Sequence, residues 1–296
     1  MENEWKTVSK KHRFRQVKKW GNECILNKSQ KFEETNISDK DTINDFINSL
    51  ITLKKSQNFE EFVKVLYENL IGSGSTNICE VVCYGIGSPS SSNISRYQLA
   101  LLYIIHIMLS APKCCEISSW PLYIHTQLQE ISSTNLKPKS DVKCFCFDPV
   151  WNSADKNLIK QMGFCVLNEN EEGKRKTDVR TLYFMIHCDK WLYNNLIWSN
   201  WCHNRLNNMT IIGNSFNSIY ERSVNRKLRK TYKFLSLVNE WDLIEEVLLP
   251  VWSKQDDVFN DTAVMRFNET ACVKYAANIE TTASLDKPPE YLSNDI

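Results

Sequence analysis

Residues 78–93 read Ile78-Cys79-Glu80-Val81-Val82-Cys83-Tyr84, followed directly by Gly85-Ile86-Gly87-Ser88-Pro89-Ser90-Ser91-Ser92-Asn93. The first seven residues are mostly apolar and rich in β-branched side chains, which predicts a buried strand. The glycine- and serine-rich part predicts a turn. Residues 94–109 predict a helix, for which Ser91 to Asn93 are N-cap candidates. A strand, a turn and a helix in this order begin a βαβ unit and indicate an α/β fold.

The same alternation continues along the chain. Short apolar stretches near 142–147, 164–167, 181–186 and 210–212 predict four more strands, and helical patterns lie between or after them. About five strands that alternate with helices predict a mostly parallel sheet with helices on both faces.

The regions outside this pattern divide the chain further. Residues 1–20 carry seven Lys and Arg against two Glu, which is typical of a solvated arm. Between 235 and 249 the pattern predicts a helix that ends at Pro250. The expected organisation is a basic tail over 1–40, a pair of packed helices over 41–72, an α/β domain over 78–267 and a tail over 268–296. Residues 110–141 predict either an extra strand near 122–125 or an insertion.

Composition excludes several classes of protein. The chain has 296 residues, of which 42% are hydrophobic and 24% charged, and a formal net charge of +1. This balance favours a globular protein over a disordered one and gives no overall field that would attract nucleic acid or a membrane. The longest apolar run, Leu99 to Leu109, is about half of the roughly 20 residues that a membrane span needs. The acidic start Met1-Glu2-Asn3-Glu4 does not resemble a secretory signal, so we expect a cytoplasmic protein that also enters the nucleus.

The cysteine pattern does not indicate a metal site. The chain has 11 Cys, and the closest pairs are Cys114-Cys115 and Cys144-Phe145-Cys146. Neither pair has the spacing of a structural zinc site, and Cys144 and Cys146 alternate within an apolar strand, where Cys acts as a small hydrophobe. We therefore expect no metal ligands.

Polar or glycine residues follow every predicted strand. Ligands of open α/β sheets bind at the carboxyl ends of the strands, so these exit turns are candidate ligand-binding positions. The candidates are Gly85, Gly87, Ser91, Asp148, Glu171, His187 and Asn214.

Two of these turns allow opposing interpretations. Gly85-Ile86-Gly87 between a strand and a helix fits a phosphate-binding turn, but a tight turn with positive φ also needs glycine. Asp148 fits the acid that binds ribose hydroxyls in dinucleotide sites, although it follows Gly87 by 61 residues instead of the usual ~20. Asp148-Pro149 could equally cap a strand and start a turn.

The turn after the strand predicted at 181–186, His187-Cys188-Asp189, places a base beside a nucleophile. Consecutive residues of a strand point to opposite faces, so this pair forms a catalytic dyad only if the strand has already ended. The chain contains no nucleophile-elbow, zinc-protease or P-loop motif. The residues therefore favour a protein without a catalytic centre, and they do not indicate which cofactor, if any, the protein binds.

Read in order, the turns resemble a known family. The resemblance is to the "sensitivity to red light reduced" (SRR-like) domain, and it covers about residues 78–267. The motifs that carry it are Cys83-Tyr84-Gly85-Ile86-Gly87, Ser95-Arg96-Tyr97-Gln98-Leu99-Ala100, Phe147-Asp148-Pro149, the run from Val166 to Arg175, Met185-Ile186-His187-Cys188, the block from Leu192 to Trp201, Ile211-Ile212-Gly213-Asn214-Ser215-Phe216 and Phe259-Asn260-Asp261-Thr262.

The resemblance implies a Rossmann-like domain and a regulatory role. Members of the family are described as regulators of circadian-clock input and, in animals, of haem biosynthesis and clock-gene expression, with regulatory protein partners that the sequence does not identify.

Two alternative functions remain. The glycine turn and polar strand ends favour an enzyme such as an S-adenosylmethionine-dependent methyltransferase with a nucleotide-like ligand, whereas the basic arm and residues 226–233 favour an RNA-binding module, which the net charge argues against.

Overall fold

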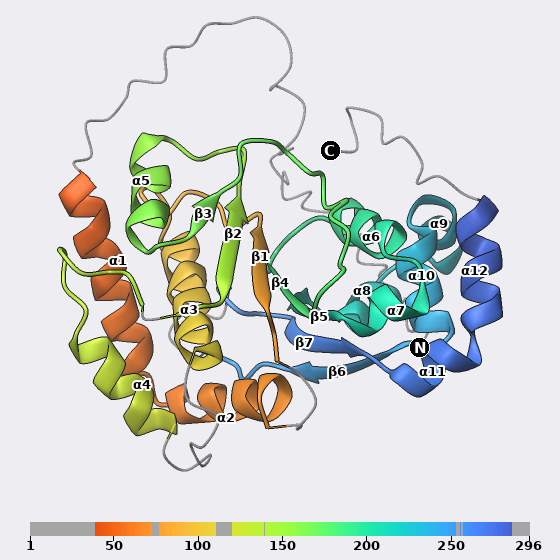
Figure 1. Ribbon diagram of the computed structural model, residues 1–296, viewed down its shortest axis with the longest axis horizontal. Helices are drawn as coiled ribbons and strands as arrows, with labels where there is room; N and C mark the ends of the chain where they lie inside the picture. Colours follow the sequence, from red (N-terminus) through yellow and green to blue (C-terminus); the bar gives the residue numbers. More distant parts are fainter. Residues whose placement is uncertain are drawn as a thin grey trace, which may run out of the picture. The chain divides into compact units, whose positions relative to one another are not determined.

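The computed structural model describes residues 39–72, 77–110, 120–138, 140–252, 255 and 257–285, all within one compact unit, Glu34–Pro289. Its centre is a seven-stranded sheet in the order β3-β2-β1-β4-β5-β7-β6 (Figure 1). The strands are β1 (Glu80–Tyr84), β2 (Lys143–Phe147), β3 (Cys165–Val166), β4 (Thr181–Met185), β5 (Met209–Asn214), β6 (Ile244–Leu248) and β7 (Thr262–Phe267).

The pairing confirms a mixed α/β protein with a mostly parallel sheet. β1 pairs in parallel with both β2 and β4, β2 with β3, and β4 with β5. β7 is antiparallel to both β5 and β6. Because β6 and β5 are both antiparallel to β7, β6 points in the same direction as the parallel strands.

The prediction of about five strands was too low, and the helix predicted over 235–249 was wrong. The helix ends at Glu240, and residues 244–248 form the edge strand β6. At the junction Asp242 has φ 51°, a left-handed conformation that interrupts the helix. Edge strands are half-exposed, and only Ile244 of β6 is buried. Isolated apolar residues of this kind also match a helical spacing, so periodicity alone does not separate the two structures.

Helices cover both faces of the sheet (Figure 1). Alternate residues of β1 show this arrangement, because Val81 and Cys83 belong to one apolar core and Val82 and Tyr84 belong to the other. The first core holds α1 (Asp39–Lys54), α2 (Phe59–Leu70), α3 (Asn93–Leu109), α4 (Trp120–Gln129) and α5 (Ser153–Gln161). The second holds residues of α6 (Lys190–Ser199), α7 (His203–Asn207), α8 (Phe216–Glu221), α10 (Lys233–Glu240), α11 (Glu269–Lys274) and α12 (Ala276–Leu285), and α9 (Asn225–Thr231) precedes α10.

The structure of the N-terminal helices, the segment 110–141 and the C-terminal segment agrees only in part with the prediction. Residues 41–72 do contain two helices, α1 and α2, and both contribute to the first core. The segment near 122–125 is helical, as part of α4, and not a strand. Residues 268–285 are not a tail, because α11 and α12 bury Cys272 and Ile279 in the second core. Residues 1–38 of the predicted basic tail lie outside the described residues, and so do residues 286–296.

Helix α6 shows why the block around Tyr193 has its unusual composition. Its buried amides bind backbone groups of neighbouring segments. Asn194 Oδ1 accepts the N–H groups of Phe234 and Leu235 at 3.0 and 3.2 Å, and Asn195 Nδ2 donates to Glu172 O at 2.9 Å. These three-dimensional contacts give the polar residues of an otherwise apolar helix a structural role.

No helix in the described part of the chain is long and apolar enough to cross a membrane.

Candidate functional site

The turn after β1 is built on two left-handed glycines. Gly85 has φ 67° and Gly87 has φ 76°. A Cβ atom on Gly85 would lie 2.6 Å from Cys188 Sγ, and one on Gly87 would lie 2.4 Å from Ser95 Oγ. Both the backbone conformation and the close neighbours therefore require glycine.

Two N–H groups of this turn, those of Gly87 and Ser90, already bind carboxylates. Asp148 Oδ2 accepts the Gly87 N–H at 2.7 Å, and its Oδ1 accepts the Val150 N–H at 2.9 Å. Asp155, which is fully buried, accepts the Ser90 N–H at 2.7 Å through Oδ1. Burial raises the pKa of Asp148, and the two N–H donors act in the opposite direction. A phosphate group at this turn would have to displace a carboxylate.

His187, two residues after the end of β4, is held from three sides. It has φ 60°, which non-glycine residues rarely adopt, and its N–H donates to Asn214 Oδ1 at 2.7 Å. Gln98 Nε2 lies 3.1 Å from His187 Nδ1 and 3.2 Å from Val258 O. Asn260 Oδ1 lies 2.9 Å from His187 Nε2.

These contacts determine the tautomer of His187. The Gln98 amide nitrogen can only donate, so His187 Nδ1 must accept. The ring proton of the neutral form is therefore on Nε2 and is donated to Asn260 Oδ1. Strained backbone together with a fixed ring is a feature of functional sites.

A pocket of about 410 Å³ opens beside His187 at the carboxyl ends of β4 and β5. It is lined largely by polar side chains, in contrast to the apolar pockets typical of drug-like ligands. The lining residues are His187, Cys188, Asp189, Lys190, Asn214, Ser215, Ser218, Ile219, Arg222, Asn260 and Asp261.

The sequence candidates thus fall into three groups. His187 and Asn214 line the pocket. Gly85 and Gly87 form the adjoining turn, and Asp148 binds this turn from the end of β2, but none of the three lines the pocket. Ser91 is exposed in that turn, and the N-cap of α3 is its neighbour Ser92. These placements leave the ligand role of each residue a prediction.

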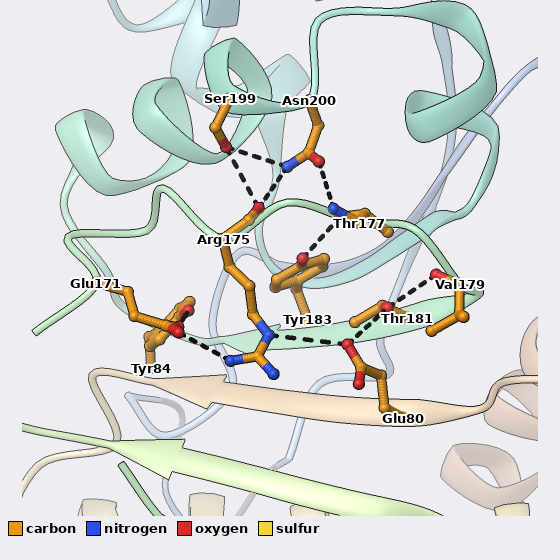
Figure 2. A network of polar contacts seen from close by, with 10 residues as sticks. All are labelled: Glu80, Tyr84, Glu171, Arg175, Thr177, Val179, Thr181, Tyr183, Ser199 and Asn200. Carbon is orange, nitrogen blue, oxygen red and sulfur yellow. Dashed lines mark hydrogen bonds and ion pairs between the residues drawn. The ribbon is translucent and has the colours of Figure 1, made fainter. Parts of the chain in front are cut away.

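Glu171 belongs to a different environment. It accepts hydrogen bonds from the Tyr84 hydroxyl and from Arg175 Nη1, the latter at 2.9 Å (Figure 2). Arg175 also pairs with Glu80 at 3.8 Å and lies 4.5 Å above the Phe145 ring. Figure 2 shows that these side chains connect the segment before β4 to the face of β1, which is a structural tie for that segment.

Several residues that line the pocket or contact His187 were not predicted from the sequence. Gln98 and Asn260 were part of the quoted family motifs, but nothing in their spacing linked them to His187. Arg222 and Lys190 were not singled out, because an isolated basic residue on a helix is usually a solvated side chain. In the described residues, no group of three His, Cys, Asp or Glu side chains is arranged to hold a metal ion.

His187 and Cys188 do not form a nucleophile–base pair in this structure. The Cys188 thiol is buried and donates to Tyr84 O at 3.3 Å, whereas both His187 ring nitrogens have other partners. Burial raises the pKa of Cys188, so little thiolate forms near neutral pH.

We predict that Cys188 resists alkylation in the native protein. In a time course with iodoacetamide read by peptide mass spectrometry, the exposed Cys79 and Cys165 should be modified under native conditions, and Cys188 only under denaturing conditions. Native modification of Cys188 at the rate of Cys165 would contradict this and would reinstate Cys188 as a nucleophile candidate.

We predict that Gly85→Ala destabilises the protein by at least about 1–2 kcal/mol, the usual cost of a left-handed conformation for a residue with a Cβ atom. The clash with Cys188 Sγ adds to this cost. The added part should disappear when Gly85→Ala is made in a Cys188→Ala background, which a double-mutant cycle of urea unfolding measures. An additive cycle would show that the two positions are not in contact.

The fold and pocket define a class: an α/β protein with a polar pocket at the carboxyl ends of its parallel strands. The family model of the SRR1 domain matches residues 59–266, and the chain belongs to this family. The resemblance carried by the motifs is thereby confirmed. No solved structure matches the chain.

Three relatives agree with this assignment. An SRR1-like protein of Mus musculus is 34% identical over 174 residues, which are 58% of this chain and 58% of the mouse protein. Protein SENSITIVITY TO RED LIGHT REDUCED 1 of Arabidopsis thaliana is 30% identical over 151 residues, which are 51% of this chain and 44% of the plant protein. An SRR1-like protein of Drosophila melanogaster is 40% identical over 70 residues, 24% of this chain and 25% of the fly protein. The matched segments cover less than two thirds of each relative.

Proposed function

We propose that this chain is a ligand-binding regulatory protein of a circadian-clock input pathway, with a role in core clock-gene expression and haem biosynthesis. The observation that carries this proposal is membership of the SRR1 family, one of whose proteins is named for reduced sensitivity to red light. The proposal includes a location in the cytoplasm and the nucleus and action through regulatory protein partners.

The geometry supports a binding role rather than covalent catalysis. The five strands ordered β3-β2-β1-β4-β5 have the strand order of Rossmann-like folds. In those folds the order in which strands are added reverses beside β1, and ligands bind at that point. The pocket at His187 adjoins this point. Its histidine is engaged with two amides, and the adjacent thiol is buried and protonated.

The experiment is a rhythm assay in cells of the source organism. Deletion of the gene should change the period or amplitude of clock-gene transcripts over several days, and re-expression of the wild-type chain should restore the rhythm. A His187→Ala variant should not restore it, whereas the matched control His203→Ala, at the start of α7 and outside the pocket, should. Unchanged rhythms after deletion would reject the clock role.

A specific observation favours one alternative, an S-adenosylmethionine-dependent methyltransferase. The sheet of these enzymes also has seven strands in the order 3-2-1-4-5-7-6, with the seventh antiparallel, and this chain has the same order and directions. A fold does not by itself specify a reaction. S-adenosylmethionine at 100 times its dissociation constant should stabilise the fold by about 2.7 kcal/mol, and no thermal shift at millimolar concentration would reject this alternative.

The RNA-binding alternative gains no comparable support. Residues 226–233 belong to α9 and the start of α10, where Leu228 is buried and Arg229 pairs with Glu240. Basic side chains on one short helix are typical of an ordinary solvated surface.

A further inference from the structure

We propose that the ligand of the His187 pocket carries a phosphate group and that Lys190, Arg222 and Lys227 bind this group. The inference rests on the proposed ligand-binding role and specifies the chemistry of the ligand. It also places the phosphate away from the glycine turn, where the sequence pattern had suggested it.

The first observation is a second pocket that shares residues with the first. It measures about 290 Å³ and is lined by Lys190, Arg222, Ser223, Val224, Lys227, Leu228 and Tyr232. Lys190 and Arg222 line both pockets, so the two spaces adjoin through these side chains. A ligand seated beside His187 therefore extends naturally between the two basic residues into the second pocket.

The second observation is the charge of this second pocket. Three of its lining residues are cations and none is an acid, in contrast to the His187 pocket, which Asp189 and Asp261 also line. Hydroxyl groups of Ser223 and Tyr232 provide further polar atoms. A tetrahedral dianion can accept hydrogen bonds from several donors at once, which suits a pocket of this composition better than a neutral group.

The third observation is that two of the three basic side chains, Arg222 and Lys190, are oriented by neighbouring groups. Asp261 binds Arg222 through both carboxylate oxygens, one of them at 2.9 Å from Nη2. Lys190 Nζ lies 3.3 Å from Ser223 Oγ. Contacts of this kind already restrict the side chains, so less side-chain entropy is lost when an anion binds.

The fourth observation concerns the competing position. The Gly87 and Ser90 N–H groups are bound by Asp148 and Asp155, so an anion at the glycine turn would meet two carboxylates. An anion in the Lys190–Arg222–Lys227 pocket would meet three cations and one neighbouring carboxylate, that of Asp261 on Arg222. Electrostatics therefore favours this pocket over the glycine turn.

The test uses inorganic phosphate as the probe and the whole 296-residue chain. Phosphate is titrated at constant ionic strength, and binding is measured by the ³¹P NMR signal, with acetate as a competitor in a parallel series. The variants are Lys190→Ala/Lys227→Ala, the charge-matched control Lys160→Ala/Lys230→Ala on exposed positions outside both pockets, and Asp148→Asn. Each variant must retain the wild-type melting temperature, and Lys227→Ala alone replaces the double variant if that one unfolds.

We expect saturable phosphate binding that is about tenfold weaker in Lys190→Ala/Lys227→Ala and unchanged in both other variants, with acetate a poor competitor. Equal weakening in the control variant, absence of saturation or equal competition by acetate would overturn the proposal. Tighter binding in Asp148→Asn alone would place the phosphate at the glycine turn and also overturn it. The rhythm assay is independent, so failure of the clock role and failure of phosphate binding are distinguishable.

Discussion

Tyr193→Ala should lower the free energy of unfolding by about 3–5 kcal/mol, the range for removal of a buried aromatic ring. Tyr193 is fully buried in α6 and packs edge-on against Phe216 with ring centroids 5.3 Å apart. Its hydroxyl donates to Met185 O and accepts the Asn214 N–H at 2.8 Å, so it joins the ends of β4 and β5. Urea unfolding followed by circular dichroism measures the effect.

The conservative variant separates the hydroxyl from the ring. Tyr193→Phe leaves the Asn214 N–H without this acceptor and should cost about 1–3 kcal/mol. Because Asn214 also binds the His187 N–H, this variant should shift the His187 ring resonances in NMR spectra. Tyr275→Phe, on a ring only partly buried and stacked on Trp241, is the control and should change stability by less than about 0.5 kcal/mol. Equal effects of the two Tyr→Phe changes would show that the Tyr193 hydroxyl has no special role.

Asn200→Ala should cost about 2–4 kcal/mol, because it leaves the buried Thr177 N–H without its acceptor and removes one of the two side-chain donors to Arg175 O. The Asn200 side chain accepts the Thr177 N–H at 2.7 Å and donates to Arg175 O at 2.8 Å, as Figure 2 shows. It is fully buried and ties the segment before β4 to the end of α6. Urea unfolding measures the cost.

Hydrogen exchange provides a local readout of the same change. The Thr177 amide should exchange faster in Asn200→Ala, while amides of β1 keep their protection under native conditions. The control is Asn204→Ala, at an exposed position of the next helix, for which we expect a change within about 0.5 kcal/mol. A cost for Asn200→Ala no greater than that of the control would show that the segment is not held by this amide.

Local pattern was sufficient for the central part of the fold. The strand, turn and helix of residues 78–109, the parallel pairing of β1, β2, β4 and β5, and the left-handed glycines follow from short-range properties: β-branched runs, helical spacing and the absence of a Cβ atom. The same reasoning failed for residues 244–248, where an edge strand with few buried side chains has no strong period. It also failed for 268–285, where α11 and α12 are held by contacts with the second core.

The site required the tertiary structure. From the sequence, His187 and Asn214 were chosen only as residues that follow strands, and that argument also chose Glu171, which the fold places in a different network. Arg222 and Asn260 line the pocket, and Gln98, near the start of α3, contacts His187 from outside it. This arrangement depends on the order of strands in space, with β7 between β5 and β6, and not on the order along the chain. The sequence determined which residue types stand at the strand ends, and long-range packing decided which of them face one another, because the contacts of His187 span 27 to 89 residues along the chain.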